Sequence, residues 1–190
     1  MQPPEPPTLV VIRGNSGSGK TTVAREVRRR YGRGCALLEQ DHLRRIVLRE
    51  HDSHGIGATA PAFITAMART ALDLGHHVVL EGILPADRYG PALRDLLAAH
   101  PGPASVYYLD IPFEETVRRH ATRAHRVTFT PQDMRGWYTP ADRLGTPGET
   151  VIGPGSTLDA TVATILHGSG LAARAPLTPC PTRCPRCAEG

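Results

Sequence analysis

Short apolar runs alternate with amphipathic stretches along most of this chain of 190 residues. Runs of three or four mainly apolar residues, bounded by glycine or polar residues, are typical of strands buried on both faces. Such strands are predicted at residues 9–12, 36–38, 77–80 and 106–109, with a fifth near 150–152. Helical spacing between the runs predicts helices at residues 20–30, 42–50, 61–74, 91–100, 112–123 and 156–167.

The same spacing predicts which helical side chains face the core. The helix at 42–50 is expected to bury three residues, Leu43, Ile46 and Val47. The helix at 61–74 is expected to bury a stripe of four, Phe63, Met67, Thr70 and Leu74. Ser156, followed by Asp159, resembles a capping box and is expected to begin the last helix. Cys35 is expected to be buried where the chain enters the second strand.

Strands that alternate with helices predict an α/β fold, with a mainly parallel sheet covered by helices on both faces. The length suits one domain, which we place at residues 8–168. A proline-rich arm at 1–7 and a proline- and cysteine-containing tail at 169–190 are expected to be flexible. Ligands of such sheets bind beyond the carboxyl ends of the strands, so the polar groups that follow the strands are the candidate functional residues.

Composition narrows the class of protein. No stretch approaches the roughly 20 apolar residues that span a membrane, and the first residues lack the basic and apolar segments of a signal peptide. We therefore expect a cytoplasmic protein with no membrane partner. The net charge of +4 suits either a nucleic-acid-binding protein or an enzyme that handles polyanionic substrates. No block of five or more basic residues occurs, which favours the enzyme.

Lys20 is the only lysine among 22 Lys and Arg residues. In a chain this rich in arginine, the exception indicates a position that needs a slim, flexible ammonium group rather than a planar guanidinium. The residues around it, Gly14-Asn15-Ser16-Gly17-Ser18-Gly19-Lys20-Thr21, match the pattern G-x-x-x-x-G-K-[ST]. A predicted strand precedes this segment and a predicted helix follows it, as the pattern requires.

This segment predicts a site for the β- and γ-phosphates of ATP or GTP. Backbone N–H groups of such a loop surround the phosphates, and the helix N-terminus adds partial positive charge. Lys20 is expected to reach the same phosphates and the Thr21 hydroxyl to bind Mg²⁺. The expected nucleotide-binding residues are Gly14, Asn15, Ser16, Gly17, Ser18, Gly19, Lys20, Thr21 and Thr22.

Carboxylates follow the second and third predicted strands. Asp41 either caps the next helix or acts as a general base toward a hydroxyl group that attacks the γ-phosphate. Glu81 either holds Mg²⁺ through water, binds substrate or caps a loop. Arg44 and Arg45 follow Asp41 on the same predicted helix, where they either hold an anionic substrate group or are solvated.

Arg119, Arg123 and Arg126 have the spacing of one helix face after the fourth strand. Like charges on one face repel by about a few tenths of a kcal/mol per pair, which a polyphosphate would offset. These arginines either close over ATP and stabilise the transferring phosphoryl group or form an exposed basic helix. Trp137 and Tyr138, near this segment, either stack on a ring or pack in the core.

Three cysteines, Cys180, Cys184 and Cys187, crowd the tail. Cys184-Pro-Arg-Cys187 is a suitable pair of zinc ligands, to which Cys180 and a distant residue such as His167 would have to be added. A flexible, reduced tail is the alternative.

Together the segments resemble small bacterial P-loop kinases, whose members are labelled kinase, uridine kinase or AAA family ATPase. The resemblance covers about residues 9–167. Besides the phosphate loop, it rests on Gln40-Asp41-His42-Leu43-Arg44-Arg45, Val79-Leu80-Glu81-Gly82 and Phe113-Glu114-Glu115-Thr116. More distantly the chain is similar to chloramphenicol phosphotransferase, zeta toxins and gluconate or shikimate kinases. The resemblance implies a three-layer fold of nucleoside-monophosphate-kinase style with a five-stranded parallel sheet, Asp41 as base, and a mobile lid bearing Arg119 and Arg123, with Arg126 as a further candidate.

The resulting hypothesis is ATP- and Mg²⁺-dependent phosphoryl transfer to a hydroxyl group of a small metabolite, nucleoside or antibiotic. The enzyme would be a monomer or homodimer. A zeta-toxin-like nucleotide-sugar kinase and a nucleotide-dependent nucleic-acid-binding protein are the alternatives. A GTPase is disfavoured because the chain has no Asn-Lys-x-Asp segment, and an ABC-type ATPase because it has no Ser-Gly-Gly signature.

Overall fold

The computed structural model describes residues 5–50, 59–121 and 129–175. The strands in this part are β1 (Leu9–Gly14), β2 (Cys35–Glu39), β3 (His77–Gly82), β4 (Ala104–Leu109) and β5 (Thr150–Ile152). The α-helices are α1 (Lys20–Tyr31), α2 (Gln40–His42), α3 (Ala60–Asp73), α4 (Ala86–Ala99), α5 (Phe113–Ala121), α6 (Pro131–Trp137) and α7 (Leu158–Gly168). A π-helical turn, η1 (Leu43–Val47), continues α2, and a 3₁₀ turn, η2 (Leu171–Ala173), follows α7.

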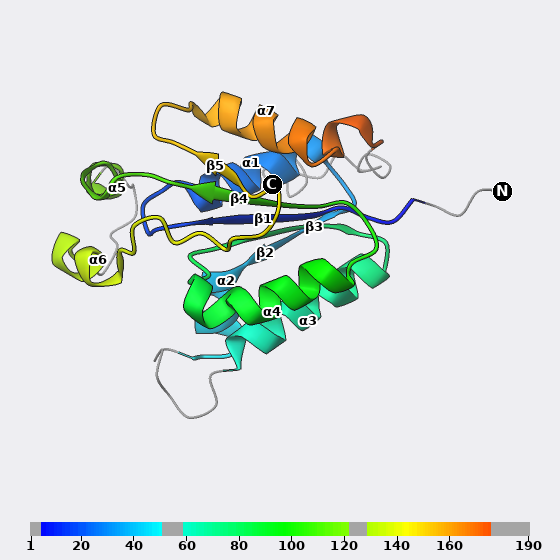
Figure 1. Ribbon diagram of the computed structural model, residues 1–190, viewed down its shortest axis with the longest axis horizontal. Helices are drawn as coiled ribbons and strands as arrows, with labels where there is room; N and C mark the ends of the chain where they lie inside the picture. The colour runs from blue at the N-terminus through cyan, green and yellow to red at the C-terminus, as the bar shows by residue number, and fades with distance from the viewer. Residues whose placement is uncertain (1–4, 51–58, 122–128, 176–190) are drawn as a thin grey trace.

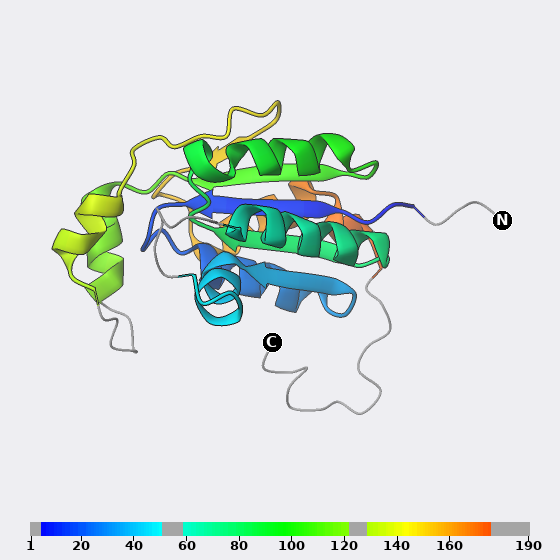
Figure 2. The ribbon, with the colours of Figure 1, turned by 90° about the horizontal axis from the view of Figure 1, so that it is seen from below.

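The five strands form one parallel sheet in the order β2-β3-β1-β4-β5. Helices α1 and α7 cover one face and α3 and α4 cover the other, so the sheet is the middle of three layers (Figure 1 and Figure 2). Helices α5 and α6 lie beyond the carboxyl ends of the strands (Figure 1). The predicted α/β fold with a five-stranded parallel sheet is confirmed. Among the described residues, no helix combines the length and apolar character needed to cross a membrane.

Strand β1 explains why the sheet has an apolar core on each face. Leu9 and Val11 pack into the cluster that contains the α3 and α4 side chains. Val10 and Ile12 pack into the cluster that contains the α1 and α7 side chains. All four are fully buried, as expected for a central parallel strand covered on both faces. The same alternation places the next residue, Arg13, on the α3–α4 side.

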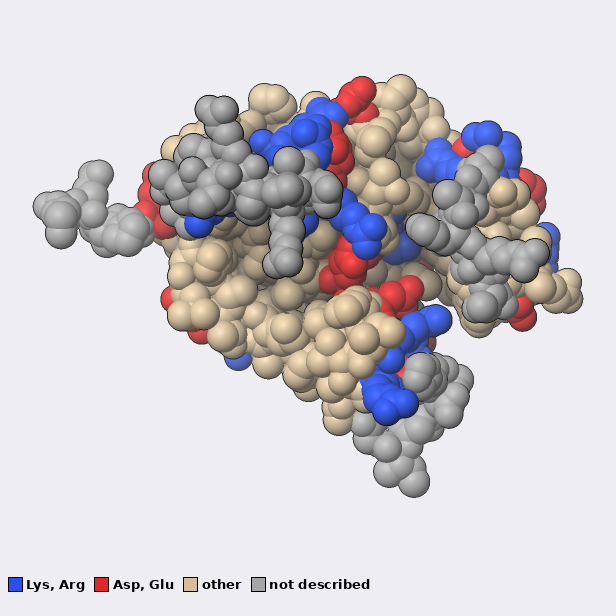
Figure 3. All heavy atoms as spheres, turned by 180° about the vertical axis from the view of Figure 1, so that it is seen from behind, with Lys and Arg blue, Asp and Glu red and all other residues tan. Residues whose placement is uncertain are grey.

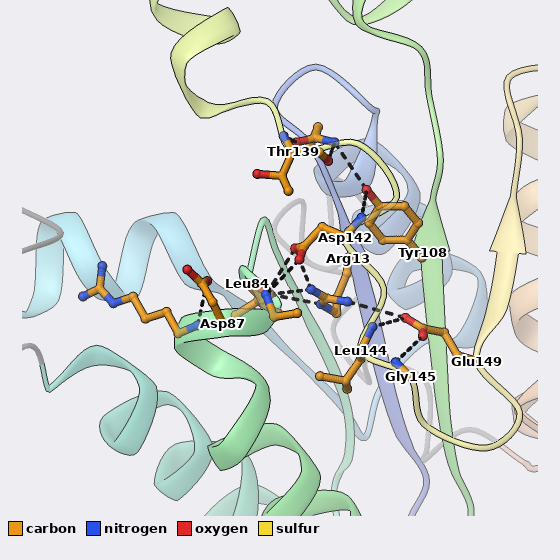
Figure 4. Close-up of polar contacts among 12 residues, drawn as sticks. Arg13, Leu84, Asp87, Tyr108, Thr139, Asp142, Leu144, Gly145 and Glu149 are labelled. Carbon is orange, nitrogen blue, oxygen red and sulfur yellow. Dashed lines mark hydrogen bonds and ion pairs between the residues drawn. The ribbon is translucent and has the colours of Figure 1, made fainter.

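Arg13 ends this apolar run and is fully buried. Its guanidinium donates to the Leu84 carbonyl oxygen from Nε at 3.0 Å and from Nη2 at 2.8 Å. It also pairs with Asp142 through Nη2 at 2.9 Å and with Glu149 through Nη1 at 3.5 Å. Figure 4 shows these groups converging from the loop after β3 and from the segment between α6 and β5. A buried cation therefore fastens two distant segments to the strand that leads into the phosphate loop.

The partners of Arg13 are themselves fixed by the backbone. Leu84 has a φ of +45°, a left-handed conformation that is uncommon for a residue other than glycine. This conformation costs about 1–3 kcal/mol. The Asp142 carboxylate accepts hydrogen bonds from the Ala86 amide at 3.2 Å, and the Glu149 carboxylate accepts two from amides of its own turn. Charges buried in this way are tolerated because their hydrogen bonds are made.

The predicted burial of the segment after β2 is only partly correct. Leu43 is buried as predicted, but Ile46 and Val47 are 65% and 51% exposed. The cause is η1, where backbone hydrogen bonds span five residues, as from the Leu48 amide to the Leu43 carbonyl at 3.0 Å. The wider turn rotates the residues after Leu43 away from the face that an α-helix would give them.

The predicted stripe of α3 is wrong. Leu74 is 73% exposed, Thr70 is exposed, and Phe63 and Met67 are only partly buried. The helix instead buries the face one residue along, formed by Ala60, Ile64, Ala68 and Leu72. The larger Phe63 and Met67 pack against the same core cluster but stay partly exposed.

The residue that caps α7 differs from the prediction, and one observed helix, α6, was not predicted. Thr157 caps α7, because its hydroxyl accepts a hydrogen bond from the Ala160 amide at 3.2 Å. The Ser156 hydroxyl, the predicted cap, lies 2.8 Å from the Thr161 hydroxyl instead. The sequence pattern did not predict helix α6, because its seven residues show no clear apolar periodicity.

Cys35 is buried at the first position of β2, as predicted, and burial raises the pKa of its thiol to about 12. Leu171 in η2 is also buried and joins the core on the α1–α7 face. Packed structure therefore continues past residue 168.

The Arg13 network predicts a large loss of stability when the cation is removed. In Arg13→Met, the partly buried carboxylates of Asp142 and Glu149 lose the cation that pairs with them, and breaking a buried ion pair costs about 3–5 kcal/mol. Arg25→Met is the control, because Arg25 pairs with Glu39 at the surface, where an ion pair contributes about 0–1 kcal/mol. Denaturant unfolding of both variants measures the difference. A loss below about 1 kcal/mol in Arg13→Met would contradict the anchoring role.

Candidate functional site

The phosphate loop connects β1 to α1 at the carboxyl edge of the sheet. Gly17 has a φ of +82°, and a Cβ there would lie 2.6 Å from the Thr116 carbonyl oxygen of α5. At Gly14 a Cβ would lie 2.8 Å from the Leu109 carbonyl oxygen of β4. Both positions need glycine because the loop lies directly against α5 and β4. Since α1 begins at Lys20, its N-terminal amides end at this loop.

Lys20 and Thr21 meet the predicted acidic residue of β3 at the start of α1. The Lys20 side chain is buried, and its Nζ donates to the Asn15 carbonyl at 3.0 Å, across the loop. The Thr21 hydroxyl donates to Glu81 Oε1 at 3.0 Å. Pairing of β1 with β3 places Glu81 beside Ile12, and so beside the start of the loop. The sheet register therefore brings together residues 60 positions apart.

Glu81 is a buried carboxylate, only 3% exposed. Burial raises the pKa of this carboxyl group above its ordinary value, and the nearby Lys20 ammonium and the Thr21 hydroxyl act in the opposite direction. With the Thr21 hydroxyl it offers the hard oxygen ligands that Mg²⁺ prefers, so the residues present fit that ion. Among residues 5–50, 59–121 and 129–175, no group of three or more His, Cys, Asp or Glu side chains could hold a metal on its own.

Asp41 lies in α2, directly after β2. Glu39 occupies the N-cap position of α2 and no side chain caps it, so Asp41 is not the N-cap. The Asp41 side chain is 63% exposed and pairs with Arg45 at 3.5 Å. Arg44 lies on another side of the turn, near Tyr89; burial raises the pKa of that tyrosine and Arg44 partly offsets the effect.

A cavity of about 100 Å³ brings together predicted residues from three segments of the chain. The phosphate loop contributes Lys20 and Thr21, and the ends of β2 and β3 contribute Asp41, Arg45 and Glu81. The aromatic side chains of Phe129 and Trp137 line the opposite wall. Figure 3 shows the face hollowed between the main body and the part that carries α5 and α6. Arg44 does not line this cavity.

A second cavity, of about 460 Å³, lies on the other side of the loop, against Ser18, Gly19 and Thr22. Arg119 lines it, and its Nη1 donates to the Ser18 carbonyl at 3.1 Å. Glu115 holds this arginine through Nε at 2.7 Å. Hydrogen bonds from Arg118 and Arg119 lower the pKa of Glu115 to about 2, so this carboxylate stays charged. One of the predicted lid arginines therefore lies at the phosphate loop.

Asn15, predicted to bind phosphate, has a second connection. Its Nδ2 donates to the Thr139 carbonyl at 2.8 Å and to the Tyr108 hydroxyl at 3.3 Å, and its Oδ1 accepts from the Thr139 amide at 3.0 Å. The Asn15 side chain thus connects the phosphate loop to Thr139, just after α6. Figure 4 shows Thr139 and Tyr108, the two partners of Asn15, near the Arg13 network.

Some predicted residues lie outside the described part of the chain, and others were missed. Arg123, Arg126 and the cysteines at 180, 184 and 187 fall in segments that the structure does not describe, so their roles stay predictions. The sequence reasoning missed Arg13 and Phe129. Arg13 could have been found because it is a charged residue directly after an apolar strand. A charge buried at such a position needs polar partners from elsewhere in the chain. Phe129 carried no such signal.

Comparison with known structures shows the same fold. The APS kinase of Mycobacterium tuberculosis, in complex with AMPPNP and APS, is 22% identical, with a TM-score of 0.67 over 90% of this chain and 100% of that one. A sugar kinase from Janibacter is 20% identical, with a TM-score of 0.66 over 91% and 100%. A gluconokinase from Sinorhizobium meliloti is 18% identical, with a TM-score of 0.61 over 89% and 94%. At these identities the likeness concerns the fold alone.

Comparison of the sequence with protein families identifies the family. No curated protein matches the chain. The AAA_33 family, described as an AAA domain, matches residues 9–140, a segment that runs from β1 past α6 and contains both the phosphate loop and Asp41. The chain therefore belongs to the AAA_33 family of P-loop AAA domains.

Proposed function

We propose that this protein is an ATP-dependent kinase that transfers the γ-phosphoryl group to a hydroxyl group of a small molecule. The observation that carries the proposal is the smaller cavity, in which Lys20 and Thr21 of the phosphate loop face Asp41 and Glu81. Asp41 is an exposed carboxylate in this pocket, where it can accept the proton of an attacking hydroxyl group. The kinases that share the fold support the same class of reaction.

ATP would lie across the phosphate loop. Its β- and γ-phosphates accept hydrogen bonds from the loop amides and from Lys20, which exchanges its bond to the Asn15 carbonyl for phosphate oxygens. The larger cavity, beside Thr22 and Arg119, has room for the nucleoside. The Thr21 hydroxyl would hold Mg²⁺ directly and Glu81 would hold it through water. When bound, that ion neutralises charge on the phosphates.

Asp41 would act as the general base. As the acceptor oxygen forms its bond to the γ-phosphorus, the bond from this phosphorus to the bridging oxygen breaks and its electron pair leaves with ADP. The proton of the acceptor hydroxyl passes to the Asp41 carboxylate. Arg45, 3.5 Å from that carboxylate, would orient it. Arg119 would stabilise the negative charge on the phosphoryl group in the transition state. Arg123 would contribute to the same effect if the lid follows the family pattern.

The surface charge gives less support to a nucleic-acid-binding protein. Several arginines pair with neighbouring carboxylates, such as Arg29 and Arg30 with Glu26 and Arg118 with Glu115. On the face in Figure 3, basic and acidic side chains lie side by side instead of forming a continuous basic surface. A nucleotide-sugar kinase stays an alternative within the same reaction class, since it differs only in the acceptor.

Substitutions in the smaller cavity separate binding from chemistry. Lys20→Ala should abolish turnover. Asp41→Asn should lower kcat by about 10²–10⁴, the usual contribution of a general base, while ATP binding persists. An ADP-release assay over nucleosides, sugars and aminoglycoside or phenicol antibiotics, paired with a nucleotide-binding assay, measures both effects. Asp73→Asn, at the exposed end of α3, is the control. Unchanged kcat in Asp41→Asn would remove Asp41 from the mechanism.

Arg119 and Arg118 form a matched pair for testing the lid. Both bind Glu115, but only Arg119 reaches the Ser18 carbonyl and the larger cavity. Arg119→Ala should lower kcat by about 10²–10³, the usual loss for one stabilising donor. Arg118→Ala should leave kcat near that of the unaltered protein. Equal losses in both variants would mean that the arginines act only through the stability of α5.

A further inference from the structure

The exposed aromatic wall of the smaller cavity carries an inference about the acceptor, which rests on the proposed function. Trp137, the only tryptophan of the chain, is 46% exposed although it lines the cavity that contains Lys20 and Asp41. The Phe129 ring lies 5.2 Å from the Trp137 ring at an angle of 68°. It also stacks on His120 of α5 at 4.7 Å. An aromatic ring that is open to solvent beside a site offers a flat apolar face to a ligand.

The helix that presents Trp137 is held at its start. Thr130 and Asp133 form a capping box at the first turn of α6. The Arg135 guanidinium lies 4.2 Å from the centroid of the Phe113 ring of α5, in a cation–π contact. These contacts fix α6 against α5 without using the Trp137 ring.

The end of α6 is held equally well. The Tyr138 hydroxyl donates to the Ile111 carbonyl at 3.1 Å, and its ring packs edge-on against Phe113. Thr139 exchanges two hydrogen bonds with Asn15 of the phosphate loop. The backbone that carries Trp137 is therefore fixed relative to the phosphate loop. The exposure of the ring is not explained by a loose helix end.

We propose that Trp137 and Phe129 form a stacking wall for the acceptor, and that the acceptor is a ring-bearing alcohol. Its hydroxyl group lies at Asp41 and a flat face of its ring packs on Trp137. The cavity of about 100 Å³ extends from Lys20 and Asp41 to the aromatic pair, and Trp137, which lines it, is 46% exposed to solvent. The ring itself therefore lies at the mouth, where the tryptophan is exposed. A sugar ring and a nucleobase share this flat face, and the experiment distinguishes them.

Trp137 fluorescence reports on this contact directly, because no other tryptophan contributes. The protein is saturated with Mg²⁺ and AMP-PNP and titrated with uridine, methyl β-D-glucopyranoside or the acyclic polyol ribitol. We expect a saturable change in emission with one of the two ring alcohols and none with ribitol. A response to uridine alone identifies a base on the wall, and a response to the glucoside alone identifies a sugar ring. If neither ring alcohol changes the emission, or if ribitol has the higher kcat/KM, the inference is wrong.

Variants separate stacking from structural support. Trp137→Leu should raise the KM for the responsive alcohol about 10- to 100-fold, the range expected for a lost stacking contact, with a smaller effect on kcat. Trp137→Phe should restore most of the affinity. Leu74→Ala, an apolar change at the 73% exposed residue that follows α3, should alter neither constant. Equal KM values for the leucine and phenylalanine variants and the unaltered protein would overturn the proposal.

The same titrations test the stacking wall separately from the proposed kinase activity. A protein that releases ADP with acyclic alcohols and shows no change in Trp137 emission would stay a kinase without a stacking wall. A protein that fails to bind AMP-PNP in the presence of Mg²⁺ would overturn the kinase proposal itself.

Discussion

The buried guanidinium of Arg13 is the interaction on which the geometry of the site depends. It lies one residue before the phosphate loop and has no access to water, so its charge must be met by protein groups. The loop after β3 supplies the Leu84 carbonyl, and the segment after α6 supplies Asp142 and Glu149 (Figure 4). Three parts of the chain are fixed around one cation. Each of these parts leads into a different wall of the smaller cavity: the phosphate loop, the end of β3, and α6.

Much of the fold could be predicted because its signals are local. A parallel strand covered on both faces must be apolar throughout, so runs such as residues 9–12 and 77–80 stand out in the sequence. The phosphate loop could be predicted because its motif is contiguous in the sequence, although its glycines are required by contacts with the distant β4 and α5. Glu81 could be expected at the carboxyl edge for the same reason, since it ends an apolar strand.

What could not be predicted depends on contacts between distant residues or on small changes in helix geometry. Arg13 finds its carboxylates 129 and 136 residues away, and no periodicity in the chain connects them. One π-helical turn was enough to move Ile46 and Val47 from the expected core to the surface. On α3, apolar residues occur on two adjacent faces, and the apolar pattern alone does not decide which of them is buried.

The two cavities border the phosphate loop and differ in the other residues that line them. Under the proposed function, the nucleoside would lie on the side built from the loop, Arg119 and the turn after β5. The acceptor would lie on the other side, whose walls come from α2, η1, the end of β3 and the aromatic pair of Phe129 and Trp137. Asn15 belongs to both structures, because its backbone carbonyl meets Lys20 while its side chain holds Thr139 beside α6. A shift of the acceptor wall therefore strains the phosphate loop. If the proposed function holds, substitutions in the aromatic wall would change the choice of acceptor only while this connection keeps the wall in place beside the phosphate loop.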